Sequence, residues 1–199
     1  MTNRKKRLAI FASGSGSNAE KIIEYFKGNQ NVHIEAIYSN RKKAKVLERA
    51  EKHKIPSITF NKSHFLEDTQ SIIDDLKSKK IDLIVLAGFL LLIPESLIDA
   101  FPQKIINIHP SLLPKHGGKG MFGSNVHQSV SESGDTESGI TVHFVNKEFD
   151  KGRIISQIKC VIKEHDDPQN IASKVLAIEH QYYPMIIDQL LENKYYEGS

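Results

Sequence analysis

The stretch KIINIHPSLLP, residues 104–114, places an amide and an imidazole where a buried strand is expected to end. Strand side chains alternate between the two faces of a sheet, so Asn107 and His109 point to one side and Ile106 and Ile108 to the other. Asn107 offers an amide donor that cannot ionise, and His109 can donate as an imidazolium. Two such donors at the carboxyl end of a strand could stabilise an oxyanion.

A carboxylate to complete this pair is best supplied by Asp150. It follows the strand predicted over residues 140–145, in a short polar loop where the chain could return beside the neighbouring strand end. A carboxylate near His109 would raise the pKa of the imidazole and could take a proton from an attacking amine. Taken singly, Asn107, His109 and Asp150 each have an ordinary structural explanation. Together, at strand ends, they favour a catalytic site.

The sequence predicts neither a covalent nucleophile nor a metal centre. There is no G-x-S-x-G turn, and Cys160, the single cysteine, lies within a predicted strand as a small buried hydrophobe. Nine histidines are present, but no H-E-x-x-H or paired-cysteine spacing accompanies them. His143 alternates with Val142 and Phe144, which is typical of a hydrogen-bonded core histidine.

A glycine-rich turn, ASGSGSNAE over residues 12–20, follows the first predicted strand and leads into the first predicted helix. Glycines let backbone N–H groups approach a phosphate, and the helix N-terminus adds unpaired donors. The turn fits the loose dinucleotide pattern G-x-G-x-x-G/A, but Asn40 and Arg41, not an acidic residue, close the next strand. A terminal monophosphate is therefore favoured, and an NADP-binding or nucleotide-binding module remains the alternative.

Short branched runs alternate with helical patterns along the first half of the chain, which predicts an α/β fold. Strands are expected at residues 8–12, 32–38, 81–89, 104–109, 140–145 and 153–162. Helices are expected from Ser17 or Asn18 to Gly28, over residues 44–54, over about 65–77, from Pro94, and over 168–191, where Pro184 is expected to bend or split the helix. This rhythm indicates a single-domain, open, mostly parallel twisted sheet with helices on both faces, a Rossmann-like arrangement spanning residues 1–199. Residues 1–7 and about 192–199 are expected to be tails, and 115–125 a glycine-rich surface loop.

The charge of the chain argues against a nucleic-acid partner. The net charge is +3 and residues 4–7 contribute +4, so the other residues together carry −1. A lone cysteine suits a reducing compartment. No apolar run reaches the roughly 18 to 20 residues that span a bilayer, and no signal-type segment opens the chain. We expect a cytoplasmic protein that binds no membrane, and the sequence leaves its oligomeric state open.

Four motifs together resemble one known family. FASGSGSN, IVLAGF, INIHPSLLP and GITVHFVNKEFDKGRII look like the successive motifs of the phosphoribosylglycinamide formyltransferases, folate-dependent enzymes of purine biosynthesis, and the similarity extends from about Leu8 to Leu191. INIHPSLLP with the later Asp-x-Gly segment is typical of the wider formyltransferase superfamily. The G-S-G-S-N turn narrows the resemblance to the phosphoribosylglycinamide formyltransferases within it. The family's fold is the one that the strand and helix pattern predicts.

The resemblance implies an activity and assigns roles to residues. The implied activity is transfer of a formyl group from the co-substrate 10-formyltetrahydrofolate to the amine of 5-phosphoribosylglycinamide. No tightly bound cofactor is implied. The transfer would use Asn107, His109 and Asp150. The remaining implied contacts are the substrate phosphate at Gly16, Ser17 and Asn18, the amine or ribose side at Glu179, and the folate at Leu90, Leu91, Leu92, Ile93, Asn107, Asn146, Lys147, Glu148, Phe149 and Asp150. Taken without the resemblance, Glu179 is expected to be a solvated helical residue.

The chain also departs from the family pattern. Many relatives carry Arg at the position of Leu91 and near the position of Phe65, so the contacts to the folate's glutamate tail differ here, and the loop at 117–124 is several residues longer. Other users of 10-formyltetrahydrofolate, a methionyl-tRNA formyltransferase or a formyltetrahydrofolate hydrolase, would need a further domain that 199 residues do not accommodate.

Overall fold

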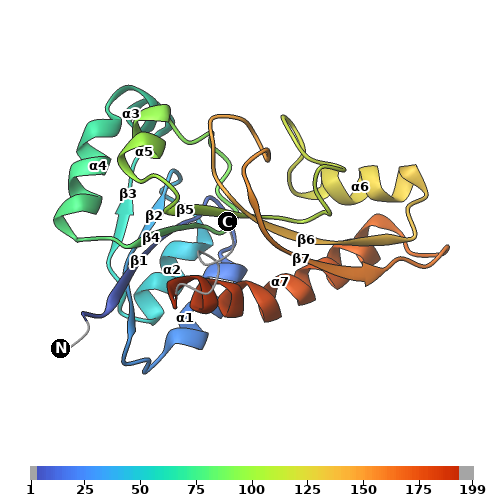
Figure 1. Ribbon diagram of the computed structural model, residues 1–199, viewed down its shortest axis with the longest axis horizontal. Helices are drawn as coiled ribbons and strands as arrows, with labels where there is room; N and C mark the ends of the chain where they lie inside the picture. The colour runs from blue at the N-terminus through green and yellow to red at the C-terminus, as the bar shows by residue number, and fades with distance from the viewer. Residues whose placement is uncertain (1–3, 193–199) are drawn as a thin grey trace. The chain divides into compact units, whose positions relative to one another are not determined.

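A computed structural model describes residues 4–192, so residues 1–3 and 193–199 of the two expected tails lie outside the described range. The described chain divides into two compact units, one ending at Ile106 and the other beginning at Asn107. Figure 1 labels the elements of both units. The expectation of a single domain stays a prediction.

The first unit is a parallel sheet with helices in its connections. Its strands lie in the order β3-β2-β1-β4, and β1 pairs in parallel with both β2 and β4. The elements are β1 (Lys6–Phe11), α1 (Ser17–Phe26), β2 (Val32–Ser39), α2 (Lys45–Lys52), β3 (Ser57–Thr59), α3 (Lys62–Glu67), α4 (Thr69–Ser78), β4 (Leu83–Leu86) and α5 (Glu95–Ala100).

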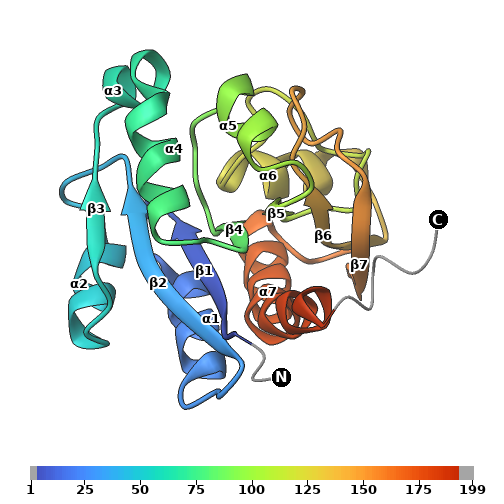
Figure 2. The same ribbon diagram turned by 60° about the vertical axis from the view of Figure 1, so that its left-hand side comes forward.

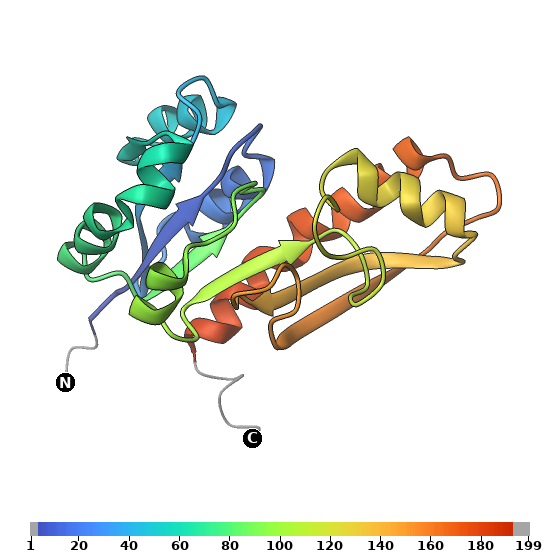
Figure 3. The same ribbon diagram turned by 90° about the horizontal axis from the view of Figure 1, so that it is seen from above.

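Helices cover both faces of this sheet. Figure 3 shows α1 and α4 on opposite sides of β1. The connections explain this, because right-handed crossovers from β1 to β2 and from β2 to β3 run in one direction along the sheet, and the crossover from β3 to β4 returns in the other. The predicted α/β class, with a mostly parallel sheet, is confirmed.

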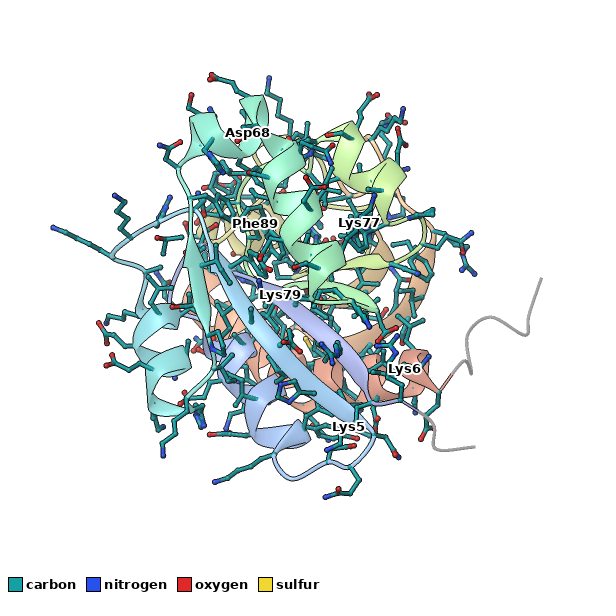
Figure 4. The ribbon with its side chains drawn as sticks, turned by 90° about the vertical axis from the view of Figure 1, so that its left-hand side faces the viewer. Lys5, Lys6, Asp68, Lys77, Lys79 and Phe89 are labelled. Atoms are coloured by element: carbon teal, nitrogen blue, oxygen red, sulfur yellow. The ribbon has the colours of Figure 1, made fainter. Side chains whose placement is uncertain are left out.

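An aromatic cluster fills the first unit near the carboxyl ends of its strands. The Phe11 ring stacks on Tyr38 with centroids 4.7 Å apart and meets Phe89 edge-on at 5.4 Å. Phe60 and Phe65 stack at 5.0 Å beside them. Figure 4 labels Phe89, which is buried, and Lys77, which is exposed on α4. The cluster gives the loops at this end of the unit a rigid base.

The second unit is built on an antiparallel pair and one long helix. Its elements are β5 (Ile105–His109), which begins in the first unit, α6 (Ser124–Ser133), β6 (Glu137–Phe144), β7 (Ile154–Val161) and α7 (Pro168–Leu191). β5, β6 and β7 follow one another in this order, and β6 pairs with β7 in antiparallel register. Figures 2 and 3 show α7 running alongside β6 and β7, and α6 packs against α7.

Several element boundaries differ from the sequence predictions. The cap of α1 is Gly16 in a left-handed conformation, φ 71°, and neither Ser17 nor Asn18 caps it. The helix expected at 65–77 is two helices, which separate at Asp68. Lys6 and Arg7 belong to β1 rather than to a tail, and Pro184 does not split α7. The short strand β3 and helix α6 were not predicted, because neither has a clear apolar period.

Within residues 4–192, no helix is long and apolar enough to cross a membrane. Over the same described residues, no group of three or more His, Cys, Asp or Glu side chains is arranged to hold a metal ion.

Gly152 sets the course of the chain between β6 and β7. A Cβ atom built on Gly152 would lie 1.7 Å from the Phe144 carbonyl oxygen, so only glycine lets the two backbone segments pass. The Phe144 amide donates to the Arg153 carbonyl at 2.9 Å, and the Arg153 guanidinium lies 4.7 Å from the centre of the Phe144 ring. These contacts close the loop that carries Asp150.

We expect Gly152→Ala to lower the free energy of unfolding by about 1–3 kcal/mol, because the backbone must shift to accept the methyl group. Gly14→Ala is the matched control, since a Cβ atom there would meet nothing within 4 Å. Urea unfolding of the two variants measures the difference. Equal stability of the two variants would contradict the close packing at Gly152.

Candidate functional site

The second unit brings Asn107, His109 and Asp150 together. Strand β5 carries Asn107 and His109, and Asp150 lies in the loop that follows β6. The His109 Nδ1 atom lies 3.5 Å from Asp150 Oδ2, and the Asp150 Oδ1 atom lies 3.7 Å from His143 Nε2. The Asn107 Nδ2 atom is 3.2 Å from the same His143 nitrogen. The amide, imidazole and carboxylate selected from the sequence therefore form one cluster, with His143 among them.

Asp150 is a largely buried carboxylate with several polar neighbours. Its side chain is 12% exposed, its φ is 55°, and its Oδ2 atom accepts a hydrogen bond from the Gly118 amide at 2.9 Å. Burial alone would raise the pKa of Asp150, but the contacts with His143 and His109 and the Gly118 hydrogen bond together lower it. Asp150 is therefore ionised at neutral pH.

His109 is held by a backbone carbonyl on one side and faces Asp150 on the other. Its Nε2 atom lies 2.8 Å from the His116 carbonyl oxygen, which can only accept, so Nε2 carries a proton. The Nδ1 atom is the one that faces Asp150. In the neutral ring Nδ1 is consequently an acceptor, and it becomes a donor only when the ring is charged.

The expected rise in the pKa of His109 is wrong. Burial lowers the pKa of this imidazole, and the charge of Asp150 and the hydrogen bond to the His116 carbonyl offset only part of that effect. The ring is almost fully enclosed, with its side chain 4% exposed, so an imidazolium loses most of its hydration there. His109 is therefore neutral in the resting protein at neutral pH.

His143 is the buried, hydrogen-bonded histidine that the strand alternation predicts. Its Nδ1 atom donates to the Phe144 carbonyl at 2.8 Å, which fixes the ring on β6. The Nε2 atom consequently faces both the Asn107 amide and the Asp150 carboxylate. It can accept from Asn107 when the ring is neutral, so His143 orients the amide of Asn107.

Further polar residues around the site were missed at the sequence level. Thr141 donates to the Ser111 carbonyl and accepts from the Leu113 amide and the Gln157 side chain. His116 bonds both Ser129 and Asp135. These residues are far apart in the chain and show no motif or periodicity, so only the folded arrangement relates them.

In the first unit, the glycine turn is fixed by buried Ser13. The Ser13 hydroxyl donates to Asn40 at 2.6 Å and accepts from the Leu90 amide at 3.0 Å, and the Ser13 amide donates to the Gly88 carbonyl. One residue thus joins the loops that follow β1, β2 and β4. Ser13 was not singled out from the sequence, where it is one of several serines in a flexible-looking turn.

Helix α2 packs against the same turn. The Val46 amide donates to the Gly14 carbonyl at 3.2 Å, and the Arg49 side chain donates to the Ser15 carbonyl at 2.8 Å. A Cβ atom on Gly16 would lie 2.5 Å from a Val46 methyl group, and its φ of 71° also favours glycine. Gly16 is buried, whereas Ser17 and Asn18 are half-buried at the start of α1, where the backbone amides have no partner within the helix.

The residues implied by the resemblance for folate binding lie in two loops. Leu90 and Leu92 are each 41% exposed and Ile93 is buried, in the loop between β4 and α5 of the first unit. In the second unit, Phe149 is 39% exposed, and the Asn146 side chain accepts from the Glu148 amide at 3.0 Å. Leu91 is half-buried, and Lys147 and Glu148 are exposed.

Glu179 differs from the expectation of a solvated helical residue. It is 8% exposed on α7, so its side chain is buried. The side chain shifts the pKa of buried Tyr183 upward, together with the larger effect of burial itself. Carboxylates are rarely buried to this extent unless they have polar contacts, so Glu179 is not the solvated residue that the helix pattern alone predicts.

The comparisons with known proteins identify the family. The formyl transferase domain matches residues 6–187 of the chain. A phosphoribosylglycinamide formyltransferase of Bacillus subtilis is 40% identical over 193 residues, covering 94% of this chain and 95% of that protein. The chloroplastic phosphoribosylglycinamide formyltransferase of Arabidopsis thaliana is 41% identical over 197 residues, which cover 96% of this chain and 67% of that protein.

A solved structure agrees with these sequence matches. The phosphoribosylglycinamide formyltransferase from Bacillus halodurans superposes with a TM-score of 0.86 at 36% identity, and the match covers 96% of this chain and all of the other. The residues that match the formyl transferase domain, 6–187, include Asn107, His109 and Asp150. The chain therefore belongs to the formyl transferase family.

Proposed function

We propose that this protein transfers the formyl group of 10-formyltetrahydrofolate to the amine of 5-phosphoribosylglycinamide, a step of de novo purine biosynthesis. The observation that carries the proposal is the cluster of Asn107, His109 and ionised Asp150 in the second unit. Family membership and the names of the relatives support formyl transfer to phosphoribosylglycinamide, and the sequence resemblance implies the folate donor. Both are small molecules, and no tightly bound cofactor takes part.

The cluster suits direct attack by an amine. The substrate nitrogen attacks the formyl carbon, and negative charge develops on the formyl oxygen in a tetrahedral intermediate. The Asn107 amide donates to that oxygen, a type of contact whose removal typically costs about 3–4 kcal/mol of barrier. A proton leaves the attacking nitrogen, and the bond from the formyl carbon to N10 of the folate breaks as N10 gains a proton.

His109 and Asp150 together handle the proton. Neutral His109 has its Nδ1 lone pair on the side of Asp150, and the two acceptor atoms lie 3.5 Å apart, so both can accept from one donor group beside them, such as the attacking amine. When Nδ1 takes the proton, the new imidazolium lies beside both the carboxylate and the developing oxyanion. The charge on His109 therefore arises during the reaction and stabilises the intermediate, with Asp150 organising the ring.

The resemblance assigns the binding of each substrate to particular residues. The phosphate of 5-phosphoribosylglycinamide would bind backbone and hydroxyl donors at Gly16, Ser17 and Asn18, where the N-terminus of α1 favours an anion. Glu179 would contact the amine or ribose side of this substrate. The folate would bind at residues 90–93, at Asn107 and at residues 146–150.

The alternative of an NADP-binding module is weakened by the first unit. Asn40, at the carboxyl end of β2 where such proteins contact the ribose, accepts a hydrogen bond from Ser13. Its side chain is therefore part of the loop framework. A module using only the glycine turn would also leave the cluster around Asp150 without a role.

We expect the purified protein to formylate 5-phosphoribosylglycinamide with 10-formyltetrahydrofolate, but to show no appreciable turnover with initiator methionyl-tRNA or with water as acceptor. Release of tetrahydrofolate, followed by absorbance, measures all three reactions. Titration with NADPH is the companion measurement, and we expect no specific binding. Turnover with tRNA or with water, but not with 5-phosphoribosylglycinamide, would contradict the proposal. It would indicate a methionyl-tRNA formyltransferase or a formyltetrahydrofolate hydrolase instead.

We expect Asp150→Asn to keep both substrates bound near wild-type affinity while kcat falls at least a hundredfold. The amide has the shape of the carboxylate but neither its charge nor its basicity, and Gly118 can still donate to it. Equilibrium binding of 5-phosphoribosylglycinamide and single-turnover rates separate the two effects. Near-normal turnover in this variant would show that Asp150 has no catalytic role.

The pH dependence of turnover should follow the neutral form of His109. Burial lowers the pKa of His109 below its ordinary value of 6.5, so kcat should fall only as the pH drops below that value, when the proton-accepting nitrogen is already occupied. The charge of Asp150 raises the pKa of His109. In Asp150→Asn, the pH below which the remaining kcat falls should therefore be lower still. A profile of kcat from pH 5 to 8 tests both signs. An acid limb centred above pH 6.5 would contradict a neutral resting imidazole.

A further inference from the structure

We propose that His116 is a positioning residue that holds the His109 imidazole in the tautomer and orientation required for formyl transfer. The inference rests on the proposed function, because it concerns the same site. His116 lies outside the residues that the resemblance assigns, and nothing in its sequence context marks it. Its contacts in the second unit give it this role.

The backbone of residues 116–118 contacts both members of the proton-handling pair. The His116 carbonyl accepts from His109 Nε2 at 2.8 Å, and two residues later the Gly118 amide donates to Asp150 Oδ2 at 2.9 Å. One short segment therefore fixes the proton of His109 on Nε2 and holds the carboxylate opposite Nδ1. A shift of this segment would disturb the imidazole and the carboxylate together.

The ring of His116 anchors that segment to the rest of the second unit. Its Nδ1 atom lies 2.8 Å from the Ser129 hydroxyl on α6, and its Nε2 atom lies 2.8 Å from Asp135 Oδ2, just before β6. The side chain is 12% exposed, so the two contacts are largely shielded from water. The ring thus connects the loop to α6 and to the segment just before β6.

Asp135, which accepts the hydrogen bond of the His116 ring, is itself held by a second contact. Its other carboxylate oxygen lies 2.7 Å from the Lys115 ammonium group. The hydrogen bonds from Lys115 and His116 lower the pKa of Asp135 to about 2, so the carboxylate stays charged over the whole working range of pH. A charged acceptor makes a stronger hydrogen bond to the His116 ring than a neutral one.

The backbone at His116 explains why such an anchor is needed. Its φ of 54° is left-handed, a conformation that costs a residue other than glycine roughly 1–2 kcal/mol. Gly117 and Gly118 follow directly and restrain the backbone little. The two ring contacts offset this cost, and without them the segment would relax and withdraw its carbonyl from His109.

The test compares the wild type with His116→Phe, which keeps an aromatic ring but loses both ring hydrogen bonds. We expect kcat to fall about tenfold, with KM for each substrate unchanged within twofold. Nitrogen-15 NMR of the His109 ring should show the proton distributed over both nitrogens, whereas it resides on Nε2 in the wild type. His33→Phe is the matched control, because His33 is 60% exposed on β2 and lies outside the site.

A second pair of variants keeps the test decisive if His116→Phe folds poorly. Ser129→Ala and Asp135→Asn each weaken one ring contact, and each should show a smaller change of the same kind, in kcat and in the His109 tautomer. In a His109→Gln background, His116→Phe should cause no further loss of kcat, because its effect passes through His109. An unchanged His109 tautomer in all three variants, or losses that add fully in the double variant, would overturn the inference.

These measurements also separate the inference from the proposed function. The NMR comparison reports the state of the His109 ring without any substrate. If the wild type failed to formylate 5-phosphoribosylglycinamide, the proposed function would fall. The tautomer result would still decide whether His116 positions His109.

Discussion

Burial of the Asp150 carboxylate is the constraint on which the second unit depends. A buried carboxylate without donors would take up a proton, and a neutral acid would not stabilise the imidazolium that forms when His109 takes the proton of the amine. The Gly118 amide donates a hydrogen bond that favours the charged form, and His109 and His143 lie beside the carboxylate. Each of these neighbours needs its own support, and the supports reach into β5, β6 and the loop before α6. Gly152 is part of the same arrangement, because its close approach to Phe144 turns the chain so that Asp150 faces the two histidines.

The first unit has a different requirement. Several loops must be held in place while backbone amide donors stay accessible to a ligand. Ser13 joins three strand ends through its hydroxyl and amide groups, and α2 supports the glycine turn from outside. Gly16, rather than the side chain of Ser17 or Asn18, caps α1. The proposed phosphate contact at the start of α1 lies on this supported turn.

Much of the fold and the chemical core of the site could be predicted from the sequence, because both depend on short-range patterns. Branched runs mark the strands, and the alternation in KIINIHP places Asn107 and His109 on one face. Asp150 could be chosen because it follows a strand end. The contacts of His116 with Ser129 and Asp135 could not be foreseen, since they join residues 13 and 19 positions apart without a repeat. The burial of Glu179 was missed because α7 has apolar residues on more than one side.

The direction of the pKa shift at His109 shows where a pattern of residue types stops being informative. A carboxylate beside an imidazole raises its pKa, and the sequence reveals that pairing but not the depth of burial that opposes it. In the folded chain burial is the larger effect, so the ring rests neutral although it lies between two acceptors, the His116 carbonyl and Asp150. Such a ring gains little from charge until a further negative group forms nearby. A developing oxyanion is such a group, so the same burial that withholds the proton at rest makes the imidazolium most stabilising at the moment the intermediate forms.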